Sequence, residues 1–328
     1  MTDPGALPRV VFIGGSGRSG STLIERVLDQ LPGACSVGET VQIWEQALAR
    51  GEPCGCGLPL VTCSFWAEVG KVAFGGWDEL DTGAIIAVKR SVDRTRRLPG
   101  LFLLGARQPR TPRGRRLAAL ADDYARPYAA LYRALAEVSG SPVIIDSSKR
   151  VMLAFCLRRV PGLDLRVVHV VRDSRAVAYS WTKQITRPEA DGGEAGAKTH
   201  METYSPARTA MRWNILNLAF QLLAARGVPT LRVRYEDFTA DPAGSVARMA
   251  EFACGPGGVP GELAAALSGR HAELGVTHTA AGNPLRFRTG RIDIRTDDAW
   301  RDRLPARARK LVYLLTAPLL AWYRYPRR

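Results

Sequence analysis

Residues 9–23 read RVVFIGGSGRSGSTL, and this stretch decides the fold. A short β-branched run leads into a turn of small residues, and the segment Ser21 to Leu31 that follows has helical spacing of its apolar side chains. Glycines let the backbone turn tightly, so that successive amide N–H groups point into one concavity, and the helix adds its positive N-terminal end. The stretch predicts an anion-binding loop from Gly14 to Leu23, against the alternative of an ordinary glycine-rich turn.

The same order of strand, turn and helix recurs along the chain. Short β-branched runs predict strands over Arg9 to Ile13, Pro142 to Ile145, Leu165 to Val171 and Thr230 to Tyr235. Helical spacing follows each of them, over Ser21 to Leu31, Lys149 to Arg159, Ser174 to Lys183 and Pro242 to Cys254. Alternating elements with nearly all-apolar strands predict an α/β fold, P-loop-like, with three α/β/α layers around a central, mostly parallel sheet.

Two long inserts separate these units within what we expect to be a single domain over residues 1–328. The insert 89–140 begins with an Arg/Pro-rich stretch and continues into an amphipathic helix that carries Tyr124, Tyr128, Leu131 and Leu135. The insert 184–206 is polar and glycine-rich. Inserts on a rigid α/β scaffold often carry substrate choice, so we expect both to lie beside a substrate.

Composition sets limits on the class of protein. An apolar fraction of 46% and a charged fraction of 23% are typical of a soluble globular protein. No signal peptide opens the sequence, and the apolar run Leu311 to Tyr323 is too short to span a bilayer, so we expect a cytoplasmic protein without stable membrane insertion. The segment Leu311 to Tyr325 is expected to be a core helix, with a dimer contact or a membrane-surface helix as alternatives.

The net charge of +15 indicates anionic partners but does not show which ones. Of 46 basic residues, 40 are Arg, and neither a dense basic tail nor aromatic–basic interleaving is present. A basic nucleic-acid-binding module therefore stays only an alternative, and we expect no nucleic-acid partner. A phosphorylated small molecule accounts for the basic residues equally well.

The six cysteines include a cluster of three, Cys54, Cys56 and Cys63. A zinc site usually needs four ligands, and no neighbouring histidine completes the set. We expect a compact loop of buried cysteines or a local disulfide, with free thiols in a reducing cytosol and no metal.

The absence of the lysine found in nucleotide-binding P-loops indicates which anion the loop would bind. The frame Gly15 to Thr22 fits G-x-x-x-x-G-K-[ST], except that Ser21 stands in place of the lysine that neutralises the phosphates of ATP. The cation is instead Arg18, inside the turn, which suits a single phosphosulfate approached end-on. A P-loop ATP-dependent small-molecule kinase remains the alternative, with Asp146 as the best candidate to hold magnesium.

Two motifs carry a resemblance to a known family. The first is Gly17-Arg18-Ser19-Gly20-Ser21-Thr22-Leu23, and the second runs from Val171 to Ser180. Together they resemble motifs of the PAPS-dependent sulfotransferases, especially a bacterial branch related to tyrosylprotein and carbohydrate sulfotransferases. The first resembles the family's 5′-phosphosulfate loop, and the second resembles its 3′-phosphate motif, in which an arginine at a strand end and a serine eight residues later bind the donor. The pair occurs in the right order, and each motif follows a predicted strand.

Further matches extend the resemblance over most of the chain. One family segment carries a catalytic glutamate, and Val37-Gly38-Glu39-Thr40 is similar to it. Another family segment supplies a lysine that contacts the donor, and Asp146-Ser147-Ser148-Lys149 is similar to that one. A family strand end lies near the adenine of the donor, and Arg234-Tyr235-Glu236-Asp237-Phe238 is similar to it. A C-terminal family segment closes over the nucleotide, and it is similar to residues 282–288, GNPLRFR.

The resemblance implies a role for each matching residue. The catalytic residues would be Glu39, Arg18 and Lys149. The donor-binding residues would be Gly17, Arg18, Ser19, Gly20, Ser21, Thr22, Arg172, Ser180, Tyr235 and Arg286. Without the resemblance, Glu39 would be a capping or surface carboxylate, Arg172 the partner of Asp173 and Ser180 a buried helix hydroxyl.

The implied activity is transfer of the sulfuryl group from PAPS to a hydroxyl acceptor, by in-line displacement that releases PAP (the EC 2.8.2 class). The resemblance implies that the reaction requires no metal. The acceptor is open among tyrosyl, glycan and natural-product hydroxyls, and we expect the inserts 89–140 and 184–206 to lie on its side. The oligomeric state is also open. Glu39 is the expected general base. His278 and His200 in loop-like segments are the alternatives, whereas His169 inside a predicted strand is expected to belong to the core.

Overall fold

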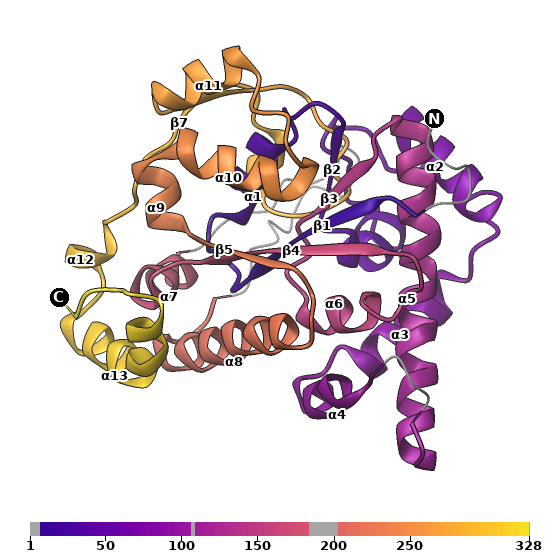
Figure 1. The fold of residues 1–328 in the computed structure, drawn as a ribbon, viewed down its shortest axis with the longest axis horizontal. Coiled ribbons are helices and arrows are strands. Elements are labelled where there is room, and N and C mark those ends of the chain that lie inside the picture. The colour runs from indigo at the N-terminus through magenta and orange to yellow at the C-terminus, as the bar shows by residue number, and fades with distance from the viewer. Residues whose placement is uncertain (1–6, 106–108, 184–202, 328) are drawn as a thin grey trace, which may run out of the picture.

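A central sheet of five parallel strands organises the protein in a computed structural model that describes residues 7–105, 109–183 and 203–327 (Figure 1). The strands are β1 (Arg9–Gly15), β2 (Ala34–Gly38), β3 (Val143–Asp146), β4 (Asp164–Val171) and β5 (Thr230–Arg234). Their order across the sheet is β2-β3-β1-β4-β5. In this register Val11 lies beside Ile145 of β3 and Arg166 of β4, so that β1 occupies the middle of the sheet.

Helices connect the strands and cover the sheet. They are α1 (Ser21–Leu28), α2 (Ser64–Phe74), α3 (Thr82–Val92), α4 (Leu98–Leu103), α5 (Pro112–Ser139), α6 (Val151–Leu157), α7 (Ser174–Thr182), α8 (Pro206–Ala225), α9 (Tyr235–Ala240), α10 (Pro242–Cys254), α11 (Gly261–Ser268), α12 (Trp300–Arg303) and α13 (Ala306–Trp322). Short 3₁₀ or π segments are η1 (Thr40–Gln42), η2 (Ile43–Leu48), η3 (Thr95–Arg97) and η4 (Pro284–Phe287). A separate antiparallel pair is formed by β6 (His271–Leu274) and β7 (Gly290–Asp293).

Successive residues of the central strands point to opposite faces, and both faces are apolar. Val10 and Phe12 pack with α2, α5, α6 and α8, whereas Val11 and Ile13 pack with α1, α10 and α11. The two helical layers lie on either side of the sheet in Figure 1, with α1 and α10 on one side and α6 and α8 on the other. The predicted three-layer α/β/α class, with its parallel sheet, is confirmed.

The chain path places a crevice at the carboxyl ends of the strands. From β1 the chain moves to β2 on one side of the sheet, and from β3 it crosses to β4 on the other side. Ligands in open α/β sheets bind at the carboxyl ends of the strands, where neighbouring connections lead to opposite sides of the sheet. The loops after β1, β2, β3 and β4 therefore converge on one place.

The four predicted strands are present within one or two residues of their expected bounds. The fifth strand, β2, was missed because its sequence Ala-Cys-Ser-Val-Gly has no β-branched run, and as an edge strand it pairs only with β3. The helix expected from Lys149 begins at Val151, since Lys149 has a left-handed backbone (φ 60°) and Arg150 is extended. The pair β6–β7 was not predicted.

The two inserts differ in what the structure describes. In the first, the predicted amphipathic helix is α5, whose Tyr124, Tyr128, Leu131 and Leu135 are buried. Most of the second, residues 184–202, lies outside the described residues. The C-terminal run forms α13, which buries Val312 and Leu320. Across the described ranges, we find no helix with the length and apolar character needed to cross a membrane.

Candidate functional site

The glycine-rich loop turns sharply between β1 and α1. Gly20 caps α1 with φ 84°, and a Cβ at this position would lie 2.1 Å from the ring of Tyr235. Only glycine combines this left-handed backbone with so close an approach. Because α1 begins directly at Ser21, its first amide groups face the loop, as the sequence predicts for an anion cradle.

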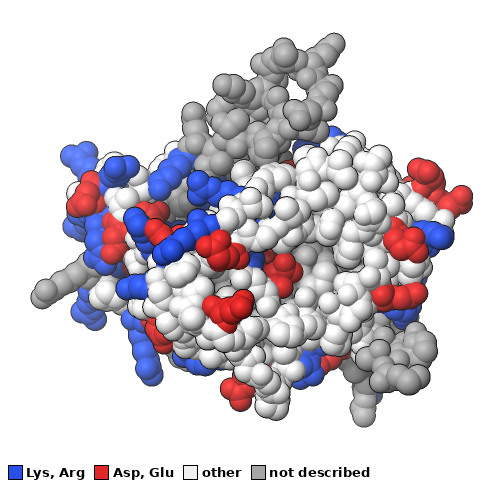
Figure 2. Space-filling view, turned by 90° about the horizontal axis from the view of Figure 1, so that it is seen from above, with Lys and Arg blue, Asp and Glu red and all other residues white. Residues whose placement is uncertain are grey.

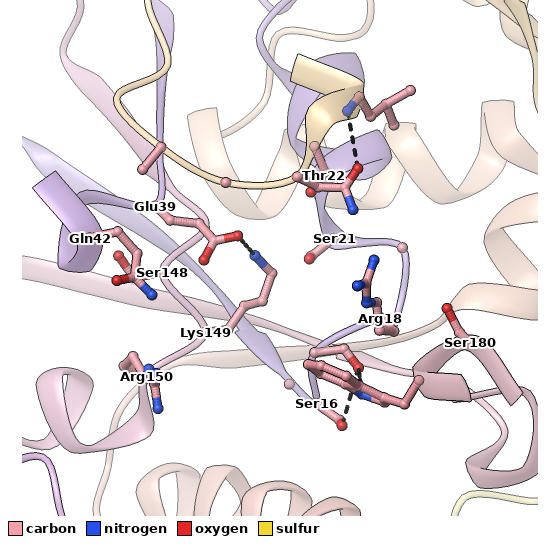
Figure 3. Close-up of a pocket in the computed structure, with 18 of the residues that line it drawn as sticks. Ser16, Arg18, Ser21, Thr22, Glu39, Gln42, Ser148, Lys149, Arg150 and Ser180 are labelled. Atoms are coloured by element: carbon pink, nitrogen blue, oxygen red, sulfur yellow. Dashed lines mark hydrogen bonds and ion pairs between the residues drawn. The ribbon is translucent and has the colours of Figure 1, made fainter. Parts of the chain in front are cut away.

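The loop opens into a cavity of ≈ 830 Å³ at the carboxyl ends of the sheet strands. Ten of the twelve different residues predicted for the site line it: Gly17, Arg18, Gly20, Ser21, Thr22, Glu39, Lys149, Arg172, Ser180 and Tyr235. They follow the ends of β1, β2, β3, β4 and β5 or belong to the helices α1 and α7. In Figure 3, Glu39 and Lys149 lie on one side of the cavity, and Arg18 and Ser180 lie on the other. The fold thus brings together residues that lie far apart in the sequence.

Ser19 and Arg286 are placed differently. Ser19 is 1% exposed and lies behind the lining. The guanidinium of Arg286 pairs with Glu52 at 3.2 Å and donates to the carbonyl of Pro53. Its neighbours Asn283 and Leu285 line the cavity instead. The donor-binding roles of Ser19 and Arg286 stay predictions, and their side chains need to move to meet a ligand there.

Glu39 and Lys149 form an ion pair in the cavity wall. The ammonium Nζ lies 2.5 Å from the carboxylate Oε1, and both side chains are largely buried (Figure 3). Glu39 directly follows β2, and the left-handed turn at Lys149 after β3 directs that residue toward it. Between the two segments, the hydroxyl of Ser148 accepts a hydrogen bond from the amide of Val41 at 2.9 Å. The carboxylate and the cation are therefore held by two adjacent strand ends.

Glu25 on α1 supports this wall, and no motif predicted from the sequence contains it. Its carboxylate accepts hydrogen bonds from the Ser36 hydroxyl, the Gly38 amide and the Ser147 hydroxyl at 2.6, 2.8 and 2.5 Å. Burial raises the pKa of Glu25 to about 7, although these hydrogen bonds and Lys149 oppose the rise. The sequence signal is a pair of charged residues, Glu25 and Arg26, on a helix that is otherwise apolar on its inner face.

Asp146, the candidate magnesium ligand of the kinase alternative, is enclosed. Its carboxylate accepts hydrogen bonds from the hydroxyls of Thr40 and Tyr132 and, at 2.7 Å, from the amide of Ser148. The side chain is fully buried, and burial raises its pKa. Asp146 therefore braces the segment that leads to Lys149 and does not face the cavity.

At the other end of the cavity, Arg172 lies beside the loop and the ring of Tyr235. It donates to the carbonyl of Arg18 at 3.2 Å, and its guanidinium is 4.8 Å from the Tyr235 ring centroid. Its acidic neighbour is Asp297 at 3.4 Å, whereas Asp173, the alternative partner from the sequence, pairs with Arg175 at 2.7 Å. The chain turns between β4 and α7, so that Arg172 and Ser180 both line the cavity.

The lining is strongly basic. Seven of its side chains are Arg or Lys and two are Glu: Arg18, Arg50, Lys149, Arg150, Arg172, Lys183 and Arg212 against Glu39 and Glu52. Figure 2 shows that basic side chains also gather on one side of the face it presents, and much of the rest of that face is uncharged. A cavity of this charge favours a ligand with several negative charges.

Trp181 contributes to the cavity, although it lies outside the motifs predicted from the sequence. Its indole N–H donates to the carbonyl of Gly17 at 3.3 Å, and the guanidinium of Arg18 lies 5.1 Å from its ring. Its position directly after Ser180 was the available signal. By contrast, the lining contains no residue from the described part of the insert 89–140, whose acceptor-side role stays a prediction.

The histidines occupy three different settings. His169 in β4 is buried, it hydrogen-bonds Asn217 at 2.9 Å, and burial lowers its pKa to about 4, as expected for a core residue. His200 lies outside the described residues. His278 is not among the cavity residues. It lies instead beside Cys54 and Cys63, which corrects the inference that no histidine accompanies the cysteines.

Comparison with known proteins finds no matching family model and no matching curated protein. Among solved structures, one similar chain is a sulfotransferase domain. It belongs to the Synechococcus PCC 7002 olefin synthase, with 20% sequence identity and a TM-score of 0.44 over 97% of each chain. A likeness at this level does not bear on activity, which is considered from the site itself.

Proposed function

We propose that the protein is a sulfotransferase that moves the sulfuryl group of PAPS to a hydroxyl acceptor, as the motif resemblance implies. One observation carries the proposal. The glycine-rich loop with Arg18 and the strand-end motif with Arg172 and Ser180 line a single cavity, which also contains the pair Glu39–Lys149. Two anion sites and a carboxylate within one cavity suit a donor with phosphates at two positions and an acceptor with a hydroxyl.

The charge of the cavity suits this donor. The loop amides at the start of α1, together with Arg18, would bind the 5′-phosphosulfate. Arg172 and Ser180 would bind the 3′-phosphate. Arg172 would then lose its contact with Asp297 and contact that phosphate instead. Tyr235 offers a ring against which a base can stack.

The residues also suit the chemistry of sulfuryl transfer. The donor supplies an activated sulfur: the acceptor oxygen forms a bond to it, and the bond between sulfur and the phosphate oxygen breaks. Glu39 would take the proton of the acceptor hydroxyl. Arg18, Lys149 and the loop amides would stabilise the negative charge that develops on the departing phosphate of PAP. Most of the acceleration would come from this positioning and charge stabilisation.

The kinase alternative gains no support from the described residues. Ser21 replaces the phosphate-binding lysine, and both oxygens of Asp146 already accept hydrogen bonds. A titration by calorimetry separates the two functions. We expect PAP to bind without magnesium and more tightly than ATP with magnesium, and the reverse order would overturn the proposal.

Variants test the assigned roles. We expect Arg18→Ala, Lys149→Ala and Arg172→Ala each to weaken PAP binding by about 10- to 100-fold, since each removes a charged contact. Glu39→Gln should not weaken PAP binding, because it frees Lys149, and should lower turnover by at least about 100-fold. Turnover is measured as label passed from PAPS to acceptors in a cell extract. Arg90→Ala, an exposed arginine paired with Glu45 away from the cavity, is the control.

The outcome for Glu39→Gln decides the base. If that variant transfers label as fast as the parent protein, Glu39 does not accept the proton. Identification of the labelled product would then also define the acceptor class among tyrosyl, glycan and natural-product hydroxyls.

A further inference from the structure

Four side chains with metal-binding atoms meet outside the cavity. Cys54, Cys56 and Cys63 belong to the loop between η2 and α2, and His278 lies far later in the chain, between β6 and η4. Their sulfur and nitrogen atoms all lie within 4.8 Å of one another. The sequence predicts no fourth ligand near the cysteines, because the fold alone brings the distant His278 to them.

Three of the distances between these atoms are close to the edges of a metal tetrahedron. The Sγ atoms of Cys56 and Cys63 are 3.7 Å apart, and Nδ1 of His278 lies 3.2 Å from Cys63 and 3.7 Å from Cys54. Zinc–sulfur and zinc–nitrogen bonds of ~2.3 and ~2.0 Å give edges of about 3.8 Å between two sulfurs and about 3.6 Å between sulfur and nitrogen. One ion at the centre can therefore contact all four atoms with small shifts of the side chains.

The surroundings hold the four residues in this arrangement. The ring of Phe65 stacks on His278 with 5.0 Å between centroids, and the indole of Trp66 donates to the His278 carbonyl at 2.7 Å. The amide of Gly55 donates to the Thr279 carbonyl at 2.9 Å. A Cβ at Gly55 would lie 2.5 Å from the Thr277 carbonyl oxygen, so glycine permits this close approach of the two segments.

The protein also encloses the sulfur atoms. Cys54 and Cys63 are buried and Cys56 is half-buried, so that the protein shields much of the cluster from water.

We propose that Cys54, Cys56, Cys63 and His278 bind a structural Zn²⁺ ion. Three thiolates and one imidazole are soft and intermediate ligands, which suit zinc and do not suit magnesium or calcium. Four protein ligands fill a tetrahedral site and leave no position for a substrate, as in structural zinc sites. The inference is independent of the sulfotransferase proposal, because it uses none of the cavity residues.

The ion would secure one wall of the cavity. From His278 the chain runs past Val37, whose carbonyl accepts from the Ala280 amide at 2.9 Å, and the Ala281 carbonyl then accepts from the Glu39 amide at 3.1 Å. The next residues, Gly282 and Asn283, line the cavity. Zinc at His278 would thus fix the segment that holds the backbone of Glu39.

Metal analysis of the full-length protein tests the proposal. After expression with zinc and extensive dialysis, we expect one zinc per chain by mass spectrometry of the metal. Replacement of zinc by Co²⁺ should give the intense visible absorption of a tetrahedral cobalt–thiolate site and a near-ultraviolet thiolate charge-transfer band. A chain without zinc that shows neither band when Co²⁺ is added would overturn the proposal. So would a Cys56–Cys63 disulfide in the freshly purified protein, detected as a loss of two hydrogens in its intact mass.

Variants separate ligation from general disturbance of the loop. Cys56→Ser and His278→Ala should lower the zinc content and bind Co²⁺ at least about 10-fold more weakly, whereas His278→Cys should restore a four-ligand site. Cys254→Ser, at an exposed cysteine far along the chain, is the control and should keep one zinc. Full zinc content in both Cys56→Ser and His278→Ala would refute the assignment. If these variants do not fold, the metal content and cobalt spectrum of the parent protein still decide it.

Discussion

Glu25 shows how one buried ionisable side chain affects the stability of the whole wall of the site. Its carboxylate is 2% exposed and accepts three hydrogen bonds from β2 and from the segment after β3. Nearby charges act on its pKa in opposite directions, since Lys149 lowers it and Glu39 raises it. Burial dominates and raises the pKa of Glu25 from 4.5 to about 7, so the folded protein retains a proton that the unfolded chain releases.

The sign of the pH dependence follows from this difference. Below pH ~4.5 both states hold the proton, and between pH ~4.5 and ~7 only the folded state does, so the contribution to stability falls as pH rises through this window. The total change is at most about 3 kcal/mol. We expect Glu25→Gln to remove this slope and to raise the free energy of unfolding at pH 8 relative to the parent protein.

Denaturant unfolding at several pH values measures the effect. In the Glu25→Gln variant, the amide oxygen of the introduced side chain can accept from Ser36 and Gly38, while its NH₂ donates to the Ser147 hydroxyl. Glu251→Gln, at an exposed carboxylate on α10, should leave the pH slope unchanged. Equal slopes in the Glu25→Gln variant and the parent protein would show that the carboxyl does not titrate in this range.

Among the elements, α1 has a second role besides presenting its amides to the loop. Arg26 on this helix is 1% exposed and donates to four backbone carbonyls, those of Gly275, Leu285, Arg286 and Arg288. The helix therefore holds the C-terminal segment against the cavity. Sequence patterns predicted the helix from its apolar spacing, but a side chain that bonds backbone so distant in the sequence leaves no local signal.

Replacement of Arg26 by methionine tests this role. Arg26→Met keeps much of the length and apolar volume of the side chain but leaves four carbonyls without that donor. We expect the free energy of unfolding to fall by about 2–4 kcal/mol, and amide hydrogen exchange over residues 275–288 to accelerate more than in β1. Arg166→Met, at a half-buried arginine on β4, is the comparison and should not change exchange in that segment. Unchanged exchange over 275–288 in Arg26→Met would contradict this role.

The elements that could be predicted from the sequence share one property, which is a dense local pattern of apolar residues. The valine-rich strands β1 and β4 and the apolar spacing of α5 have it, whereas β2, with its small residues, does not. Most of the predicted residues that line the cavity belong to two short motifs, and both motifs follow strands whose ends a parallel sheet brings together. The positions of Arg286 and His278 depend on the path of a late loop, which no local pattern encodes.

At the scale of the whole molecule, the C-terminal helix α13 packs against the carboxyl end of β4, which Arg172 directly follows. Leu320 and Tyr323 of the α13 region pack with Val171 and Trp213. The hydroxyl of Tyr325 donates to Glu236 at 2.6 Å and lies 3.1 Å from the Val171 carbonyl oxygen. The expected core position of this run is confirmed for its inner face, whereas Leu314 and Trp322 on its outer face are exposed.

A truncation tests the contribution of this helix. Removal of residues 306–328 would uncover Val171 and Trp213, and each buried apolar side chain is worth roughly 1.5–3 kcal/mol. We expect the free energy of unfolding to fall by more than about 5 kcal/mol, with loss of PAP binding, because Arg172 follows Val171. Trp322→Ala, which shortens a side chain that is 64% exposed, should change stability by less than about 1 kcal/mol. An unchanged denaturation midpoint in the truncated chain would contradict this role of α13.

The ion pair between Glu39 and Lys149 has a consequence for the order of events in the cavity. On the proposed function, the lysine serves one substrate and the carboxylate serves the other, yet in the protein without substrates they bind each other at 2.5 Å. An anion that draws Lys149 away makes the carboxylate oxygen available to a hydroxyl, so each substrate favours the binding of the other. Because such coupling is reciprocal, the factor by which the donor tightens binding of the acceptor equals the factor by which the acceptor tightens binding of the donor.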